Sequence, residues 1–162
     1  MLIVFSGLPG TGKTTIARAL ARATGAMHLR IDSIEHALRR AGYRVEGEGY
    51  AVAHLVASDN LRLGRIVIAD CVNPWPLTRR DWHAVAQAAA VASLDIEIAC
   101  SDAAVHRHRS ESRVSDLEGH RLPSWPEITA RDYQPWQGDR LVLDTACLSV
   151  DESVQRILEQ IA

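Results

Sequence analysis

The segment Gly7-Leu8-Pro9-Gly10-Thr11-Gly12-Lys13-Thr14 decides which fold this chain can adopt. It has the spacing GxxxxGK[ST], an apolar run that predicts a strand precedes it, and a helical pattern follows it. Glycines at these positions let successive backbone N–H groups turn inward around phosphate oxygens, while the next helix presents its own free N–H groups. The segment therefore predicts a phosphate-binding loop between a strand and a helix.

Side chains at the end of this loop complete the predicted nucleotide site. Lys13 can reach the β- and γ-phosphates of ATP, and the Thr14 hydroxyl can bind Mg²⁺. Lys13 is the only lysine in the chain, and every other basic side chain is an arginine. A compact ammonium suits a narrow loop in which a planar guanidinium would be too bulky. We therefore expect ATP and Mg²⁺ as cofactors, held by the loop from Gly7 to Thr15.

Outward from the loop, short apolar runs alternate with helical patterns. This alternation predicts an α/β fold in which helices cover both faces of a parallel sheet. Five strands are predicted, at residues 2–5, 27–30, 65–69, 95–100 and 140–143. Four helix starts are predicted from capping boxes, in which a capping residue precedes an acid by three positions: Asp32/Glu35, Thr78/Asp81, Ser124/Glu127 and Ser149/Glu152. Residues 46–64 are predicted to be mostly helical.

Residues 114–137 depart from the alternation. They contain Gly119 and the prolines Pro123, Pro126 and Pro135, and they leave room for only a short central helix. A connection of this length within a small domain is typical of a lid or a binding loop. A chain of 162 residues can bury one good core but not two. We therefore predict a single domain over residues 1–162, with a lid and acceptor-binding insertion at about 114–137.

Composition narrows the possible partners and compartments. A net charge of -2 and a pI near 6.4 give no basic surface for a nucleic-acid backbone, so nucleic acid is not expected as a partner. No apolar run approaches the roughly 20 residues that span a bilayer, and the first residues lack the pattern of a signal peptide. Cys71, Cys100 and Cys147 suit neither a disulfide framework nor a zinc site. We expect a cytoplasmic monomer or homodimer that does not enter a membrane.

The loop and the order of elements resemble the family of small bacterial P-loop kinases, a group within the AAA-type P-loop ATPases. It includes zeta toxins, chloramphenicol phosphotransferase, gluconate kinase and adenylylsulfate kinase. The resemblance runs along nearly the whole chain, although only the phosphate loop is specific. It implies a P-loop three-layer sandwich with strand order 2-3-1-4-5, an aspartate at the end of the second strand that faces the acceptor, and an arginine-bearing lid.

Two aspartates occupy the positions of the family's acidic residues. Asp32 follows the second predicted strand, where the resemblance implies a carboxylate that orients the acceptor hydroxyl or accepts its proton. Asp32 could instead be a helix N-cap, with Glu35 completing a capping box. Asp70 follows the third strand, where the resemblance implies contact with Mg²⁺, directly or through water. The next residue is Cys71, whereas hydrolytic motors usually have a glutamate there that activates water.

Arginines after the fourth strand occupy the place of the family's lid arginines. On a helix, Arg109 and Arg113 share one stripe with His106, while Arg107 points nearly the opposite way. Arg109 and Arg113 are thus the predicted pair that clamps phosphates and offsets charge in the transition state, unless they belong to a solvated charged face. The resemblance also places the loop after the fifth strand beside adenine, which makes Thr145 a candidate contact.

The acceptor is expected to contact the ends of the second and third strands. The candidate side chains are Arg30, Arg39, Asn73, Trp75 and Arg79, with further contacts from residues 120–126. The leading prediction is an ATP- and Mg²⁺-dependent kinase that phosphorylates a hydroxyl of a small molecule. Two alternatives remain open, a polynucleotide 5′-kinase, and a nucleotide-dependent switch or slow ATPase that has no acceptor.

Overall fold

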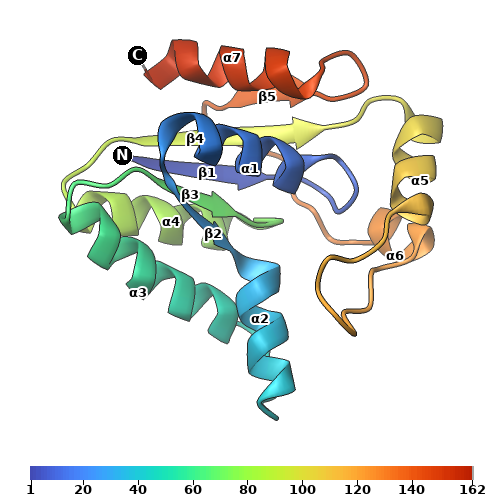
Figure 1. The fold of residues 1–162 in the computed structure, drawn as a ribbon, viewed down its shortest axis with the longest axis horizontal. Coiled ribbons are helices and arrows are strands. Elements are labelled where there is room, and N and C mark those ends of the chain that lie inside the picture. Colours follow the sequence, from blue (N-terminus) through green and yellow to red (C-terminus); the bar gives the residue numbers. More distant parts are fainter. Residues whose placement is uncertain (162) are drawn as a thin grey trace.

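Five parallel strands form the centre of the structure, a computed structural model that describes residues 1–161 (Figure 1). The strands are β1 (Leu2–Ser6), β2 (Met27–Arg30), β3 (Val67–Asp70), β4 (Ser93–Ala99) and β5 (Leu141–Asp144). Their order in the sheet is β2-β3-β1-β4-β5, which confirms the predicted fold and strand order. In this register the end of β1 lies between β3 and β4, because Phe5 pairs with both Asp70 and Ile96. The phosphate loop therefore begins at the middle of the sheet.

Helices cover both faces of the sheet. Helices α1 (Lys13–Thr24) and α7 (Val150–Ile161) lie on one face, and α3 (Glu48–Arg62) and α4 (Pro76–Ala88) lie on the other (Figure 1). Alternate residues of β1 divide between the two cores, with Phe5 packed among Ile16, Leu20 and Ile157, and Val4 on the side of Trp82. Buried strands with apolar residues on both faces are what a parallel sheet between two helical layers requires.

The remaining helices stand at the carboxyl ends of the strands. They are α2 (Ile31–Arg40), α5 (Ala103–Ser112) and the short α6 (Trp125–Thr129), which is the only helix of the described chain within residues 114–137. The helix predicted within residues 46–64 is α3. None of the helices in residues 1–161 is both long and apolar enough to span a bilayer.

Two of the four predicted capping boxes are present. Glu127 accepts hydrogen bonds from the backbone N–H and the hydroxyl of Ser124, and Glu152 does the same with Ser149. The other two are wrong. Helix α2 begins at Ile31, directly after β2, so that Asp32 lies inside its first turn and Glu35 pairs with Arg39 instead. Helix α4 begins at Pro76, because proline is well suited to the first helical position, and Thr78 therefore lies inside the helix.

Candidate active site

The phosphate loop links β1 to α1 in a conformation that depends on glycine. Gly7 has a φ of 134°, and a Cβ there would lie 2.2 Å from the carbonyl oxygen of Ile98. Gly10 has a φ of 85°, and its Cβ would lie 2.1 Å from the Ser110 hydroxyl. The loop thus packs against β4 on one side and α5 on the other, which explains why these positions exclude a side chain.

Helix α1 presents its positive end to this loop. Gly12 is the N-cap with a φ of 97°, and the first intrahelical bond runs from Ile16 N–H to the Gly12 carbonyl. The N–H groups of Lys13, Thr14 and Thr15 therefore have no partner within the helix and can receive an anion. The Lys13 ammonium donates to the Leu8 carbonyl at 3.0 Å, which folds the side chain back over the loop.

Two carboxylates act on the charge of Lys13. Burial lowers the pKa of Lys13, and the charges of Asp70 and Asp32 oppose that shift. Asp70 is itself buried, which alone would raise its pKa, but the hydrogen bond with His28 at 3.2 Å, the charge of Lys13 and the Thr14 hydroxyl together lower it. Asp70 is therefore ionised beside the phosphate loop.

Thr14 and Asp70 offer oxygen ligands that fit Mg²⁺. Magnesium in nucleotide sites is commonly held by one or two protein oxygens, with phosphates and water completing the octahedron. No group of three or more His, Cys, Asp or Glu side chains in residues 1–161 could hold a metal by itself. The donor set thus suits an ion that arrives with a nucleotide, rather than one held in a cage made only of protein.

Asp32 extends from the first turn of α2 toward the space in front of the loop. Its side chain is 52% exposed, and its carboxylate lies 3.8 Å from the Arg30 guanidinium. It makes no capping hydrogen bond, because Arg30 occupies the N-cap position. The alternative role of Asp32 as a helix cap is therefore excluded, and the carboxylate is free to contact an acceptor.

The predicted arginine pair separates into two different places. Arg109 donates to the Thr145 hydroxyl at 3.0 Å and to the Thr145 carbonyl at 3.2 Å, so it lies beside the loop after β5. Arg113 is the C-cap of α5, and burial lowers its pKa although the charge of Asp32 opposes the shift. Arg107 points away, in an exposed ion pair with Glu111. One arginine is thus on the side of Thr145 and the other on the side of Asp32.

Thr145 itself is buried and holds the phosphate loop from behind. Its hydroxyl lies 2.8 Å from the Thr11 carbonyl and 3.1 Å from the Ala99 carbonyl, within hydrogen-bond distance of both. Its side chain is therefore occupied by contacts within the protein. Any contact of this loop with a nucleotide base would have to come from its backbone or its neighbours.

His106 is a site residue that the sequence reasoning did not single out as one. Its Nε2 atom lies 2.9 Å from the Pro9 carbonyl, and its ring meets the Trp125 ring edge-on with centroids 5.0 Å apart. His106 thus connects the phosphate loop to α6, which lies within the predicted lid. Its position on the same helical stripe as Arg109 could have identified it. His106 also lies four residues before Ser110, which is buried and packs on Gly10.

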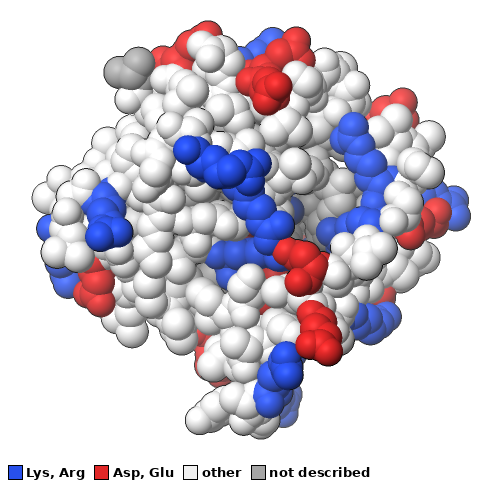
Figure 2. Space-filling view, in the orientation of Figure 1, with Lys and Arg blue, Asp and Glu red and all other residues white. Residues whose placement is uncertain are grey.

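A cleft of about 1300 Å³ brings these residues together. Lys and Arg side chains gather on both sides of the hollow between α1 and α5 (Figure 2). The predicted site residues that line it are Pro9, Gly10, Gly12, Lys13, Thr14, Thr15, Asp32, Asp70, Arg109 and Arg113. Gly7, Leu8, Thr11 and Thr145 do not line the cleft but support it. Ten of the fourteen predicted site residues therefore line one cleft.

The acceptor side of the cleft matches the prediction only in part. Arg30, Arg39 and Trp75 line it, as do His120, Arg121 and Pro123 from the predicted lid. Asn73 does not, because it is buried and its amide donates to the Ser6 hydroxyl. Arg79 also lies outside the cleft. Of the five predicted acceptor contacts, Asn73 and Arg79 therefore do not line the cleft.

Arg79 instead fixes the segment that follows α6. Its guanidinium donates to the backbone carbonyls of Asn73, Pro74, Gln134 and Pro135. It also lies over the Trp136 ring, 4.2 Å from the centroid. These contacts tie residues 134 and 135, in the predicted lid, to the turn that follows β3.

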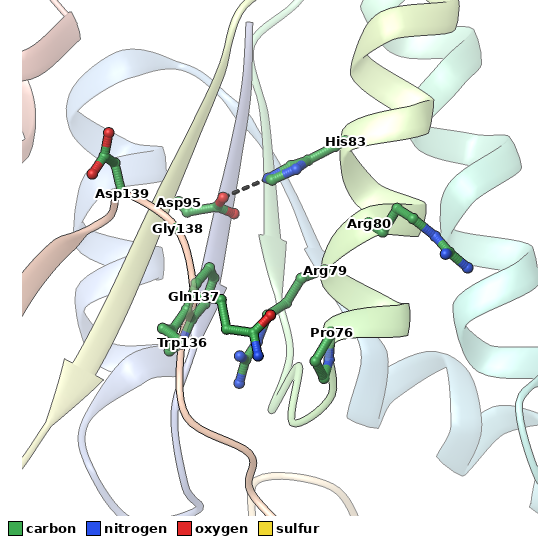
Figure 3. Close-up of a pocket in the computed structure, with 9 residues that line it drawn as sticks. All are labelled: Pro76, Arg79, Arg80, His83, Asp95, Trp136, Gln137, Gly138 and Asp139. Carbon is green, nitrogen blue, oxygen red and sulfur yellow. Dashed lines mark hydrogen bonds and ion pairs between the residues drawn. The ribbon is translucent and has the colours of Figure 1, made fainter.

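A second, smaller pocket of about 220 Å³ lies beside Arg79 (Figure 3). His83 points from α4 toward Asp95 of β4, and their side chains are 2.5 Å apart (Figure 3). Burial raises the pKa of Asp95, although the bond with His83 opposes the shift. No residue that lines this pocket lines the large cleft. The phosphate loop and the small pocket are therefore separate features.

Comparisons with known proteins agree with this arrangement. Residues 2–124 match a family described as an AAA domain. The APS kinase of Mycobacterium tuberculosis, solved with AMPPNP and APS, has a TM-score of 0.75 at 19% identity, over 99% of this chain and 96% of that chain. A gluconokinase from Sinorhizobium meliloti has a TM-score of 0.64 at 16% identity, over 98% and 94% of the two chains.

A third similar structure is Kti12 of Chaetomium thermophilum in complex with ADP-AlF3. Its TM-score is 0.66 at 21% identity, and the match covers all of both chains. No curated protein sequence matches the chain. At these identities the similar structures establish a fold shared with small P-loop kinases.

Proposed function

The chain belongs to the AAA domain family, and we propose that it is a kinase that transfers the γ-phosphoryl group of ATP to a hydroxyl of a small molecule. The observation that carries this proposal is the convergence of Lys13, Asp70 and Asp32 on one cleft in front of the phosphate loop. The geometry suits phosphoryl transfer, because catalysis of that reaction consists mainly of positioning and charge stabilisation.

Each residue has a proposed task. The free N–H groups at the start of α1 and the Lys13 ammonium hold the β- and γ-phosphates. Thr14 and Asp70 hold Mg²⁺, directly or through water, and the ion when bound neutralises charge on those phosphates. Asp32 accepts a hydrogen bond from the acceptor hydroxyl and orients its oxygen toward the γ-phosphorus. Arg113, on the side of Asp32, offsets the negative charge that develops between donor and acceptor.

Transfer to an acceptor is favoured over simple hydrolysis by the residue after Asp70. Cys71 is buried and its thiol donates to the Phe5 carbonyl at 3.3 Å. Burial raises the pKa of this thiol, so it stays protonated and cannot activate water as a carboxylate would. We also propose that residues 1–162 act as one domain with a lid at about 114–137. Free thiols at all three cysteines suit a cytoplasmic protein.

The test is consumption of ATP in the presence of Mg²⁺ with a panel of small hydroxyl compounds, with 5′-hydroxyl oligonucleotides included, while phosphorylated product is followed. The wild-type protein should phosphorylate at least one small acceptor. Tight nucleotide binding with no product from any acceptor would favour the switch or slow ATPase and would count against the kinase.

Variants locate the activity in the cleft. Asp32→Asn should lower kcat by about 10²- to 10⁴-fold, the usual contribution of a positioned acid or base, with ATP affinity close to unchanged. Lys13→Ala should weaken nucleotide binding or turnover. Asp59→Asn, on the exposed side of α3, is the matched control and should behave as wild type. Normal transfer by Lys13→Ala would refute the site.

A further inference from the structure

A carboxylate from the predicted lid pairs with Arg30, which lines the cleft, and with Arg18, which is not among the lining residues. Asp116 accepts hydrogen bonds from Arg30 at 2.8 and 2.9 Å, one to each carboxylate oxygen, and it forms an ion pair with Arg18. Arg18 belongs to α1 and Arg30 ends β2, whereas Asp116 belongs to the connection between α5 and α6. A connecting loop therefore supplies the anion, and α1 and β2 supply the two cations.

Arg30 stands between this carboxylate and the predicted catalytic aspartate. The side chain of Arg30 is only 11% exposed and lines the cleft. One of its terminal nitrogens bonds Asp116, and the other lies 3.8 Å from Asp32. A group bound where Asp116 now lies would thus be separated from Asp32 by the width of a single guanidinium. That spacing places it within the reach of one small acceptor molecule.

The two arginines present donors that fit an oxyanion. The hydrogen bonds from Arg18 and Arg30 hold the pKa of Asp116 far below its usual value, so the carboxylate is charged. Phosphate, sulfate and carboxylate groups all accept such paired guanidinium donors. Arg40 and Arg131 also line the cleft, and within the described chain neither forms an ion pair. Arg40 and Arg131 thus add two cations without an ion pair to a lining that also contains the carboxylates of Glu35, Glu46, Asp81 and Glu127.

We propose that the acceptor carries an anionic group, a phosphate, sulfate or carboxylate, which Arg18 and Arg30 bind in place of Asp116 when the acceptor enters the cleft. This inference rests on the proposed kinase function, because it identifies the class of acceptor for the same cleft. Asp116 keeps the largely buried Arg30 paired when no acceptor is bound, since an unpaired buried charge is costly. Exchange of one oxyanion for another releases the lid connection and brings the acceptor beside Asp32.

The first experiment measures binding of an anion without any turnover. Inorganic sulfate is titrated into the protein and followed by NMR, in the Lys13→Ala background so that the phosphate loop does not contribute. Asp116→Asn frees both arginines and should tighten sulfate binding about tenfold, the effect of about one charge-assisted hydrogen bond. Adding Arg30→Gln should abolish that gain. Unchanged sulfate affinity in Asp116→Asn, or a gain that survives Arg30→Gln, would overturn the proposal.

The second experiment compares matched acceptors. Ribose 5-phosphate is compared with ribose, and gluconate with glucose, by kcat/KM in the wild-type protein. In any pair that yields phosphorylated product, the kcat/KM of the anionic compound should be at least about tenfold higher than that of the neutral one. Arg30→Gln should reduce that ratio. Arg22→Gln is the control, because Arg22 lies one turn after Arg18 on α1, is exposed and has no ion pair within residues 1–161.

The two experiments separate the failure of this inference from the failure of the kinase proposal. Equal phosphorylation of neutral and anionic acceptors would leave the kinase in place and refute an anionic acceptor. If no acceptor is phosphorylated, the kinase proposal fails, and the sulfate titration still decides whether Arg18 and Arg30 form an oxyanion site. If the contact of Asp116 with Arg18 and Arg30 only holds the connection between α5 and α6 in place, Asp116→Asn would not tighten sulfate binding. That outcome counts against the proposal.

Discussion

Replacement of Arg79 by methionine tests whether this arginine serves the structure or the acceptor. The substitution keeps an unbranched side chain of similar length but removes every N–H donor. Four backbone carbonyls, of Asn73, Pro74, Gln134 and Pro135, then lose a charged donor, and Trp136 loses the cation stacked on its ring. Arg79 is only 5% exposed, so water cannot easily replace those donors.

The expected cost follows from these contacts. A hydrogen bond to a charged group contributes about 1.5–3 kcal/mol, so four would sum to about 6–12 kcal/mol if they were independent. They share one side chain, and the bonds to Gln134 and Pro135 are only partly buried, so solvent can recover some of the loss. We expect a decrease of about 3–5 kcal/mol in the free energy of unfolding, the range for removing one partner of a buried charged contact.

Urea denaturation of Arg79→Met measures this cost, and Arg80→Met is the matched control. Arg80 is the next residue of α4, is exposed, and forms no ion pair within residues 1–161, so its replacement should change the free energy of unfolding by no more than about 0.5 kcal/mol. If Arg79→Met has wild-type stability but a raised KM for the acceptor, the structural role is refuted and Arg79 is an acceptor contact after all.

Two further predictions concern stability. Gly7→Ala should cost more than Gly25→Ala. Both positions have a positive φ that strains a residue with a Cβ, but only at Gly7 would the Cβ also meet the backbone of Ile98, which adds about 1–3 kcal/mol. Equal costs by urea denaturation would show that the loop can shift. Burial lowers the pKa of His54 below 6.5, so the unfolded chain binds a proton more readily than the folded one and the free energy of unfolding should fall as the pH drops through that value. His54→Phe should flatten this dependence between about pH 5 and about pH 7.5, and an unchanged slope would assign it to other groups.

The fold could be predicted from local signals because each of them acts over a few residues. The phosphate loop specifies a strand before it and a helix after it, and the apolar runs specify the other strands with errors of one or two residues at their ends. The strand order followed from resemblance, since periodicity alone does not say which strands are neighbours. The wrong helix starts have a local cause, because Pro76 fixes the start of α4 more strongly than Thr78 could.

The site was predictable where the backbone determines it and less so where side chains choose among partners. Asp32 and Asp70 reach the cleft because parallel strands end at the same edge of the sheet. The charge and position of Arg79 suggested an acceptor contact, yet its guanidinium binds the backbone carbonyls of residues 134 and 135, which are distant in the sequence. That contact depends on where residues 134 and 135 return in space, which no spacing within α4 reveals.

Asp116 illustrates the same limit on the opposite side of the cleft. In the sequence it is one acid in a loop with Glu118 nearby, and nothing local links it to Arg18 or Arg30, which lie 98 and 86 positions away. Only the folded chain shows that the connection between α5 and α6 brings Asp116 to Arg18 and to Arg30, which lies beside Asp32. Because those cations belong to α1 and β2 while the anion belongs to the lid, the contact can exchange without disturbing the sheet. In the proposed exchange, the group that binds Arg18 and Arg30 in place of Asp116 would also determine where the connection between α5 and α6 lies.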